Sequence, residues 1–205
     1  MNNTGETSLE NYQAESFPEP VAPQPERQSG ILRYVLDILE TLVLSLVLFA
    51  IINAVSARIR VDGFSMQPTL ETGEFVIVNK LAYKLGSPRL GDVVVFHYPR
   101  DPEQEYIKRV IGLPGDSVRV ADGQVTVNNI LIDEPYIAAA PAYQTEITVP
   151  ENSLFVLGDN RNNSSDSHNW GPVPMENVIG KAIFVYWPPQ NWGTIEHANP
   201  ASAAP

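Results

Sequence analysis

The chain has 205 residues, a hydrophobic content of 43% and a formal net charge of −11, and it contains no cysteine. This length fits one domain of about 100 to 200 residues with additional segments. Because no segment is rich in Lys and Arg, nucleic acid is not an expected partner. Without cysteine, the chain cannot form disulfide bonds, thiolate metal sites or a cysteine nucleophile, so any nucleophile must be an oxygen or a nitrogen.

The first segment, residues 1–29, is rich in Glu, Pro, Gln, Ser and Asn and has few apolar side chains. Such a composition cannot bury enough apolar surface to fold. We therefore expect a disordered, acidic, Pro-rich tail.

The next segment, residues 31–57, is strongly apolar and contains neither Gly nor Pro. Its charges Arg33, Asp37 and Glu40 fall at i, i+4 and i+7, which places them on one face of a helix. Residues 41–57 carry no charge, and as a helix they span about 25 Å, enough to cross a bilayer. This pattern predicts a transmembrane helix whose first third lies at the membrane interface.

Two alternatives for this segment are a buried core helix and a cleavable secretory signal. Residues 55–57, Val-Ser-Ala, resemble a cleavage site made of small residues. The apolar run, however, begins late and follows an acidic leader, which favours an uncleaved anchor. Two arginines lie on each side of the span, so the positive-inside rule does not decide its orientation.

Residues 58–190 show short β-branched and aromatic runs separated by Gly, Pro, Asp and Asn turns, which predicts an all-β domain of irregular antiparallel sheet. We expect residues 191–205 to form a C-terminal tail. The predicted strands are EFVIVN, DVVVFHY, YIKRVIG, SVRV, QVTVN, SLFVLG and VIGKAIFVYW.

Ser65 follows the helix closely, in the stretch VDGFSMQPTLETGE. Gly63, Pro68 and Gly73 favour an irregular backbone there, and an irregular loop can present a hydroxyl. Taken alone, Ser65 is better explained as an ordinary turn serine.

Lys108 lies in a predicted strand, where alternation places Tyr106, Lys108 and Val110 on one face. Either Lys108 or Arg109 must then share a face with apolar neighbours. A lysine pKa is ordinarily about 10.4, and lowering it by roughly three units for base work at neutral pH costs about 4 kcal/mol. Desolvation among Tyr106, Val110 and Phe96 is one source of this energy. The alternative is a lysine that reaches solvent from a half-buried strand.

Four ordered segments and the apolar helix before them resemble the signal peptidase I family of membrane-bound Ser/Lys proteases. The likeness covers about residues 31–187 and implies an all-β catalytic domain behind one transmembrane helix. It further implies a serine endopeptidase that cuts N-terminal signal peptides from exported pre-proteins after small residues. The matching segments are SMQPTL, GDVVVFHYP, YIKRVIGLPGD and GDNRNNSSDSHNWGPV.

Residue by residue, the resemblance implies that Ser65 is the nucleophile, Lys108 the general base and Ser164 a hydroxyl that orients the lysine. It also implies residues that brace the wall of the site, and residues near shallow pockets for small substrate side chains. The bracing residues are Asp159, Arg161 and Asp166, and the pocket residues are Met66, Phe96 and Tyr106.

Two positions depart from the family pattern. Gly63 stands where many members carry a serine that helps to hold the oxyanion, so backbone N–H groups or another group must do so here. His168 stands where the family often has an arginine paired with the aspartate that corresponds to Asp166.

The resemblance implies two partners, signal-peptide-bearing pre-proteins and a lipid bilayer, and no cofactor. Cleavage on the exported side implies a cytoplasmic N-terminus and an extracytoplasmic catalytic domain in a single-pass protein of the cell (plasma or inner) membrane, with the thylakoid membrane also possible. We expect no metal site, because the sequence has neither calcium-loop spacing nor a His/Cys cluster.

Three other interpretations are open. A Ser-His-Asp triad needs Ser65, His97 or His168, and Asp159 or Asp166, and it leaves the lysine without a role. A self-cleaving Ser/Lys repressor domain shares the dyad but should have a helix-turn-helix and no anchor. A membrane-tethered β-module that binds envelope proteins has no catalytic function.

Overall fold

The computed structural model of the chain describes residues 30–197. The expected acidic tail, residues 1–29, and residues 198–205 lie outside the described residues. The chain divides into two compact units after Leu44, within the first described helix.

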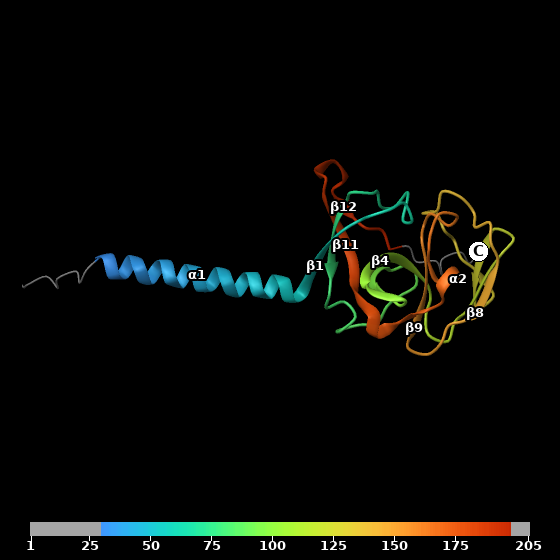
Figure 1. Ribbon diagram of the computed structural model, residues 1–205, viewed down its shortest axis with the longest axis horizontal. Coiled ribbons are helices and arrows are strands. Elements are labelled where there is room, and N and C mark those ends of the chain that lie inside the picture. Colours follow the sequence, from blue (N-terminus) through green and yellow to red (C-terminus); the bar gives the residue numbers. More distant parts are fainter. Residues whose placement is uncertain (1–29, 198–205) are drawn as a thin grey trace, which may run out of the picture. The chain divides into compact units, whose positions relative to one another are not determined.

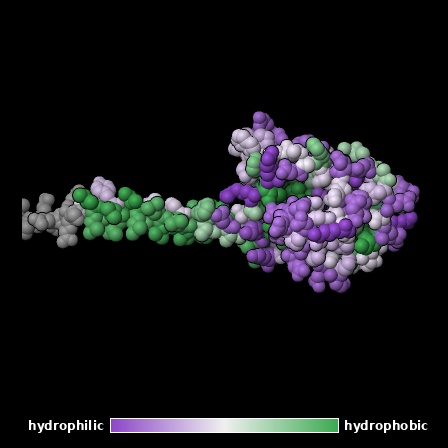
Figure 2. All heavy atoms as spheres, in the orientation of Figure 1, coloured by the Kyte–Doolittle hydropathy of each residue, from purple (hydrophilic) through white to green (hydrophobic). Residues whose placement is uncertain are grey.

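Helix α1 (Gly30–Val55) is the only described helix that is long and apolar enough to cross a membrane. None of its residues is buried, and its surface is apolar over most of its length (Figure 2). This exposure does not fit the core-helix alternative. The helix ends two residues before the predicted boundary, because Ser56 and Ala57 instead pair with Asn79 and Val78 as the start of a strand.

All strand pairs are antiparallel, as predicted, and they form a larger and a smaller sheet. Figure 1 labels β1, β4, β9, β11 and β12 of the larger sheet and β8 of the smaller one. The order of the larger sheet is β1-β2-β11-β3-β4-β9-β10, with β12 paired to β11. The strands are β1 (Ser56–Arg60), β2 (Phe75–Asn79), β3 (Val93–Tyr98), β4 (Asp101–Gly112), β9 (Ser153–Leu157), β10 (Val173–Pro174), β11 (Val178–Trp187) and β12 (Gly193–Thr194).

The smaller sheet has the order β7-β6-β5-β8. It shares a core with the larger sheet, since its valines pack with Ile111 of β4 and with Phe155 and Leu157 of β9. Its strands are β5 (Ser117–Ala121), β6 (Gln124–Val127), β7 (Ile130–Leu131) and β8 (Thr145–Thr148). The short helices are α2 (Ser167–Trp170), η1 (Met175–Asn177) and η2 (Pro189–Asn191).

Each of the seven predicted runs contains a strand, and the all-β fold class is confirmed. Strands β1, β7, β8, β10 and β12 were not predicted, and three of them, β7, β10 and β12, have only two residues each. Strand β12 pairs with β11, so the folded domain extends past the predicted boundary at residue 190.

Candidate active site

A loop between β1 and β2 presents Ser65. The N–H of Val61 donates to the carbonyl of Glu74 at 2.8 Å, which closes the base of the loop. Met66 and Leu70, each 1% exposed, anchor the loop in the core. The loop that carries Ser65 is therefore anchored at its base and in the core.

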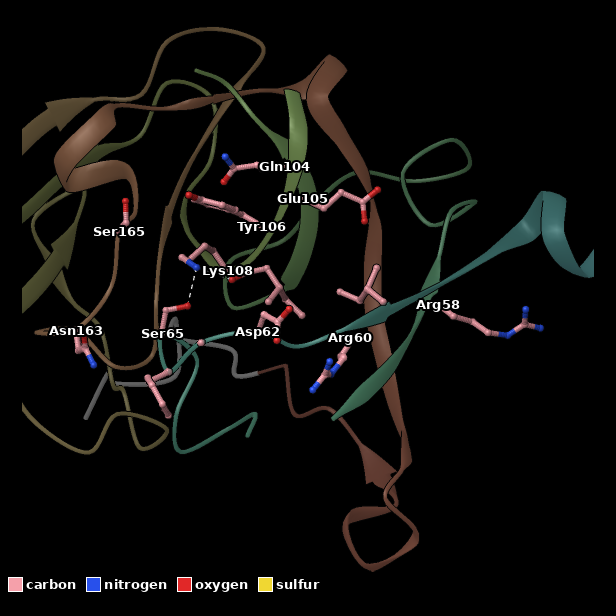
Figure 3. Close-up of a pocket in the computed structure, with 14 residues that line it drawn as sticks. Arg58, Arg60, Asp62, Ser65, Gln104, Glu105, Tyr106, Lys108, Asn163 and Ser165 are labelled. Carbon is pink, nitrogen blue, oxygen red and sulfur yellow. Dashed lines mark hydrogen bonds between the residues drawn. The ribbon is translucent and has the colours of Figure 1, made fainter. Parts of the chain in front are cut away.

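Lys108 reaches Ser65 from strand β4 (Figure 3). Its Nζ lies 2.8 Å from Ser65 Oγ and 2.9 Å from the carbonyl oxygen of Ile107. The side chain is buried, and this desolvation lowers the pKa of Lys108 to about 8 although the charges of Asp166 and Asp159 oppose the shift. A substantial fraction of Lys108 is therefore neutral near physiological pH and can accept a proton.

A cavity of about 770 Å³ opens beside this pair, between β1, β4 and the loop after β9. Gly63, Phe64, Tyr106 and Asn163 line it together with the dyad. Gly63 has a φ of +96°, a conformation that a residue with a side chain rarely adopts. The loop shape thus favours glycine at this position.

Of the three expected pocket residues, only Tyr106 lines the cavity. Met66 and Phe96 are 1% and 0% exposed and lie in the hydrophobic core. Phe96 packs against the Tyr106 ring at a centroid distance of 6.3 Å. Phe96 therefore packs behind Tyr106 in the core and does not line the cavity itself.

The loop after β9 packs closely against the nucleophile loop. The N–H of Asn160 donates to the carbonyl of Ser65 at 3.0 Å, and a side chain at Gly158 would overlap that carbonyl and Ser164 Oγ. Ser164 Oγ is buried and has no hydrogen-bond partner among the described residues. The structure thus brings Ser164 beside Ser65 without the expected hydrogen bond to Lys108.

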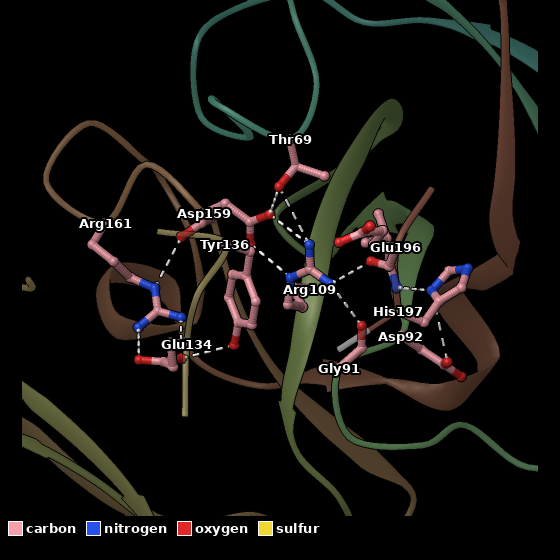
Figure 4. Close-up of polar contacts among 12 residues, drawn as sticks. Thr69, Gly91, Asp92, Arg109, Glu134, Tyr136, Asp159, Arg161, Glu196 and His197 are labelled. Carbon is pink, nitrogen blue, oxygen red and sulfur yellow. Dashed lines mark hydrogen bonds and ion pairs between the residues drawn. The ribbon is translucent and has the colours of Figure 1, made fainter. Parts of the chain in front are cut away.

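One of the two cations of this strand was expected among apolar neighbours, and the structure buries both, since Arg109, the residue after Lys108, is fully buried as well. Its guanidinium binds the Asp159 carboxylate through two hydrogen bonds of 2.8 and 2.7 Å (Figure 4). It also donates to the carbonyls of Gly91 and Glu196, each at 2.9 Å. From Ile107 onward, β4 is buried on both faces, and this ion pair makes the burial of Arg109 possible.

Arg161 binds Glu134 through its two terminal nitrogens, Nη1 and Nη2, and its Nε donates to the carbonyl of Gly158 at 3.1 Å. The Tyr136 ring lies 4.0 Å from the Arg109 guanidinium carbon and 6.0 Å from that of Arg161. Sequence reasoning missed Glu134 and Tyr136, because no local pattern indicates a contact between segments so far apart.

Asp166 caps helix α2 and accepts a hydrogen bond from the Gly158 N–H at 3.0 Å. Its other oxygen lies 2.6 Å from His168 Nδ1. His97 is exposed and lies 3.0 Å from the carbonyl of Pro102 instead. No histidine among residues 30–197 bonds to Ser65, so the described residues do not form a Ser-His-Asp triad.

Residues 33–187 match the family described as "Signal peptidase, peptidase S26". The chain is 41% identical to a signal peptidase I of Leptolyngbya laminosa, over 86% of this chain and 90% of the relative. It is 44% identical to a probable signal peptidase I-2 of Synechocystis sp., over 75% and 73% of the two chains. It is 40% identical to thylakoidal processing peptidase 1 of Arabidopsis thaliana, over 71% and 46%. The chain therefore belongs to the peptidase S26 family of signal peptidases.

Proposed function

We propose that this chain is a membrane-anchored signal peptidase I that cuts N-terminal signal peptides from exported pre-proteins after small residues, with Ser65 as nucleophile and Lys108 as general base. The observation that carries the proposal is the 2.8 Å contact between Lys108 Nζ and Ser65 Oγ. This contact lies in a buried setting that lowers the pKa of the lysine, at the wall of a cavity large enough for a peptide segment.

The chemistry follows from the two side chains. Neutral Lys108 accepts the Ser65 proton while Oγ attacks the scissile carbonyl, and the resulting ammonium protonates the leaving amine. A water molecule that gives its proton to the same lysine then hydrolyses the Ser65 ester. The lysine passes this second proton to Ser65 Oγ as the ester bond breaks, so the dyad is regenerated after one turnover.

The oxyanion needs a donor other than a side chain at Gly63. The N–H of Ser65 makes no hydrogen bond within the described range, and it adjoins the attacking Oγ. We assign it to the oxyanion. One such donor contributes about 3 to 4 kcal/mol of transition-state stabilisation.

The substrate binds as an extended strand in the cavity beside β1. Strand β1 ends the larger sheet, and an edge strand offers backbone groups to a peptide. The apolar helix α1 anchors the enzyme in a membrane. We place the β-domain on the exported side and the N-terminus in the cytoplasm, because signal peptides are removed after they cross.

The experiment is cleavage of a pre-protein with an Ala-X-Ala site by the detergent-solubilised full chain. We expect a new N-terminus directly after the site, lost with Ser65→Ala and Lys108→Ala and kept with Ser87→Ala, a control at an exposed loop serine. Cleavage by Ser65→Ala at the unmutated rate would contradict the proposal. The intact mass of the same sample shows whether the chain is cut after Ala57.

The relatives are named as peptidases, and no comparison favours a non-enzymatic module or a self-cleaving repressor domain. The same assay separates the first of these from the proposal, because a binding module would leave every pre-protein intact.

A further inference from the structure

Three buried carboxylates hold the loop after β9, and each has one basic side chain as its partner. Arginine keeps its charge throughout the pH range in which proteins are stable, whereas histidine ordinarily changes charge between about pH 5 and 8. The pairs are Asp159 with Arg109, Glu134 with Arg161, and Asp166 with His168. Asp166 alone among these three has a partner whose charge depends on pH.

Asp166 connects its partner to the dyad through the backbone. Its Oδ2 accepts the N–H of Gly158 at 3.0 Å, and Gly158 packs directly against the Ser65 carbonyl and Ser164 Oγ. Its Oδ1 accepts from the backbone and the ring of His168, at 3.2 and 2.6 Å. The carboxylate is completely buried, so its orientation depends on these contacts.

The His168 ring is placed both to hold Asp166 and to gain a proton. We assign Nδ1 as the donor, because an ionised carboxylate only accepts, and Nε2 has no partner among residues 30–197. The side chain is 15% exposed, so solvent reaches the ring. On its other side the ring stacks on Tyr143, with centroids 3.8 Å apart and planes at 10°.

The other charged groups near the Asp166–His168 pair are Glu134, Arg161 and Lys108. Glu134 and Arg161 act electrostatically on Tyr143, but they form an ion pair with each other and their charges largely cancel. Lys108 of β4 feels Asp166 more strongly than any other charge. The net charge of the Asp166–His168 pair is therefore the part of the local field that changes with pH.

We propose that His168 is a positioning residue that holds Asp166 and Gly158 beneath Ser65 and, on gaining a proton, cancels the attraction of Asp166 for the Lys108 ammonium. This inference rests on the proposed function, since it takes Lys108 as the base. As a consequence, the two protonations have opposite effects on the rate of cleavage. As the pH falls, protonation of Lys108 slows cleavage, while protonation of His168 lowers the pKa of Lys108 and preserves part of the neutral lysine.

The test is kcat/KM for pre-protein cleavage by the full chain between pH 5 and 9. We compare the unmutated chain with His168→Asn, which keeps a donor near the Nδ1 position without charge, and His168→Arg, which is always charged. The expected rate at pH 6 is highest for His168→Arg, intermediate for the unmutated chain and lowest for His168→Asn. Below pH 7 the unmutated rate should fall less than tenfold per pH unit, and the His168→Asn rate close to tenfold.

Profiles of identical shape for all three chains would overturn the inference, even if a variant were uniformly slower, because a purely structural role moves every point alike. Thermal unfolding of each variant verifies that the folded enzyme is being measured, and if His168→Arg does not fold, the slopes of the other two chains still decide. Failure of the proposed function gives a different result, since the unmutated chain would then show no Ser65-dependent cleavage at any pH.

Discussion

Arg109 and Asp159 form a two-point ion pair in which neither side chain is exposed to solvent. This pair follows directly on the catalytic lysine candidate in β4 and ties that strand to the loop after β9. It fixes Lys108 from the opposite face of the sheet, although neither Arg109 nor Asp159 has a hydrogen bond to Ser65 among the described contacts.

Removal of one partner of this pair should destabilise the domain strongly. Asp159→Asn leaves the buried Arg109 charge without a counterion, which costs about 3 to 5 kcal/mol in free energy of unfolding. Denaturant unfolding measures this loss. The matched control is Glu146→Gln, which breaks an exposed pair with Arg119 at 3.9 Å and should cost less than about 1 kcal/mol. Equal effects of the two substitutions would show that the buried pair is not structurally important.

Gly158→Ala should impair both folding and catalysis. A Cβ at Gly158 would overlap the Ser65 carbonyl and Ser164 Oγ, so the nucleophile loop must shift, at a cost of about 1 to 3 kcal/mol. We expect kcat to fall together with the unfolding temperature. In Gly193→Ala the new Cβ meets its nearest atom only at 3.9 Å, and this control should behave like the unmutated chain. An unaffected Gly158→Ala enzyme would mean that the close packing of the two loops is unimportant.

Ser164→Ala separates stability from catalysis. Because Ser164 Oγ is buried without a partner among the described residues, its removal breaks no hydrogen bond and should change the free energy of unfolding by less than about 1 kcal/mol. If Ser164 orients Lys108 during the reaction, kcat should fall about tenfold, the equivalent of one hydrogen bond. Rate and stability are measured on the same preparation. An unchanged kcat would remove Ser164 from the proposed site.

The rate of cleavage should rise with pH through the titration of Lys108. Burial lowers the pKa of this lysine to about 8, and only its neutral form accepts the Ser65 proton. In kcat/KM measured from pH 6 to 11, the rising limb should therefore have its midpoint near pH 8, well below the ordinary lysine pKa of about 10.4. Lys84→Ala, at an exposed loop lysine, should leave the midpoint in place. A limb that appears only above pH 10 would contradict the assignment.

The helix and the main strands were predictable because their signals are local. The run from Ile31 to Val55 is apolar without interruption by Gly or Pro, and β2, β3 and β11 are β-branched or aromatic along most of their length. The helix end was misplaced by two residues, since Ser56 and Ala57 suit a helix as well as a strand. Their pairing with β2 decided between them.

The site was predictable only in part. Ser65 and Lys108 were found through ordered segments, and the structure places them in contact. The partners of Arg109 and Arg161 were not, because Asp159 and Glu134 lie 50 and 27 residues away along the chain and only tertiary packing brings them together. Strand alternation likewise does not reveal which face lines a cavity, so Phe96 was expected at the surface of the site and lies in the core.

The most direct test of the Ser65–Lys108 assignment uses the absence of cysteine from the chain. In Lys108→Cys the new thiol is the only one, and it lines the cavity where a small reagent can reach it. Alkylation with 2-bromoethylamine rebuilds a lysine-like amine at residue 108. We predict no pre-protein cleavage by Lys108→Cys before alkylation and recovered cleavage after it, with none recovered when Ser65→Ala is also present. Full activity of unalkylated Lys108→Cys would show that an amine at residue 108 is not the base.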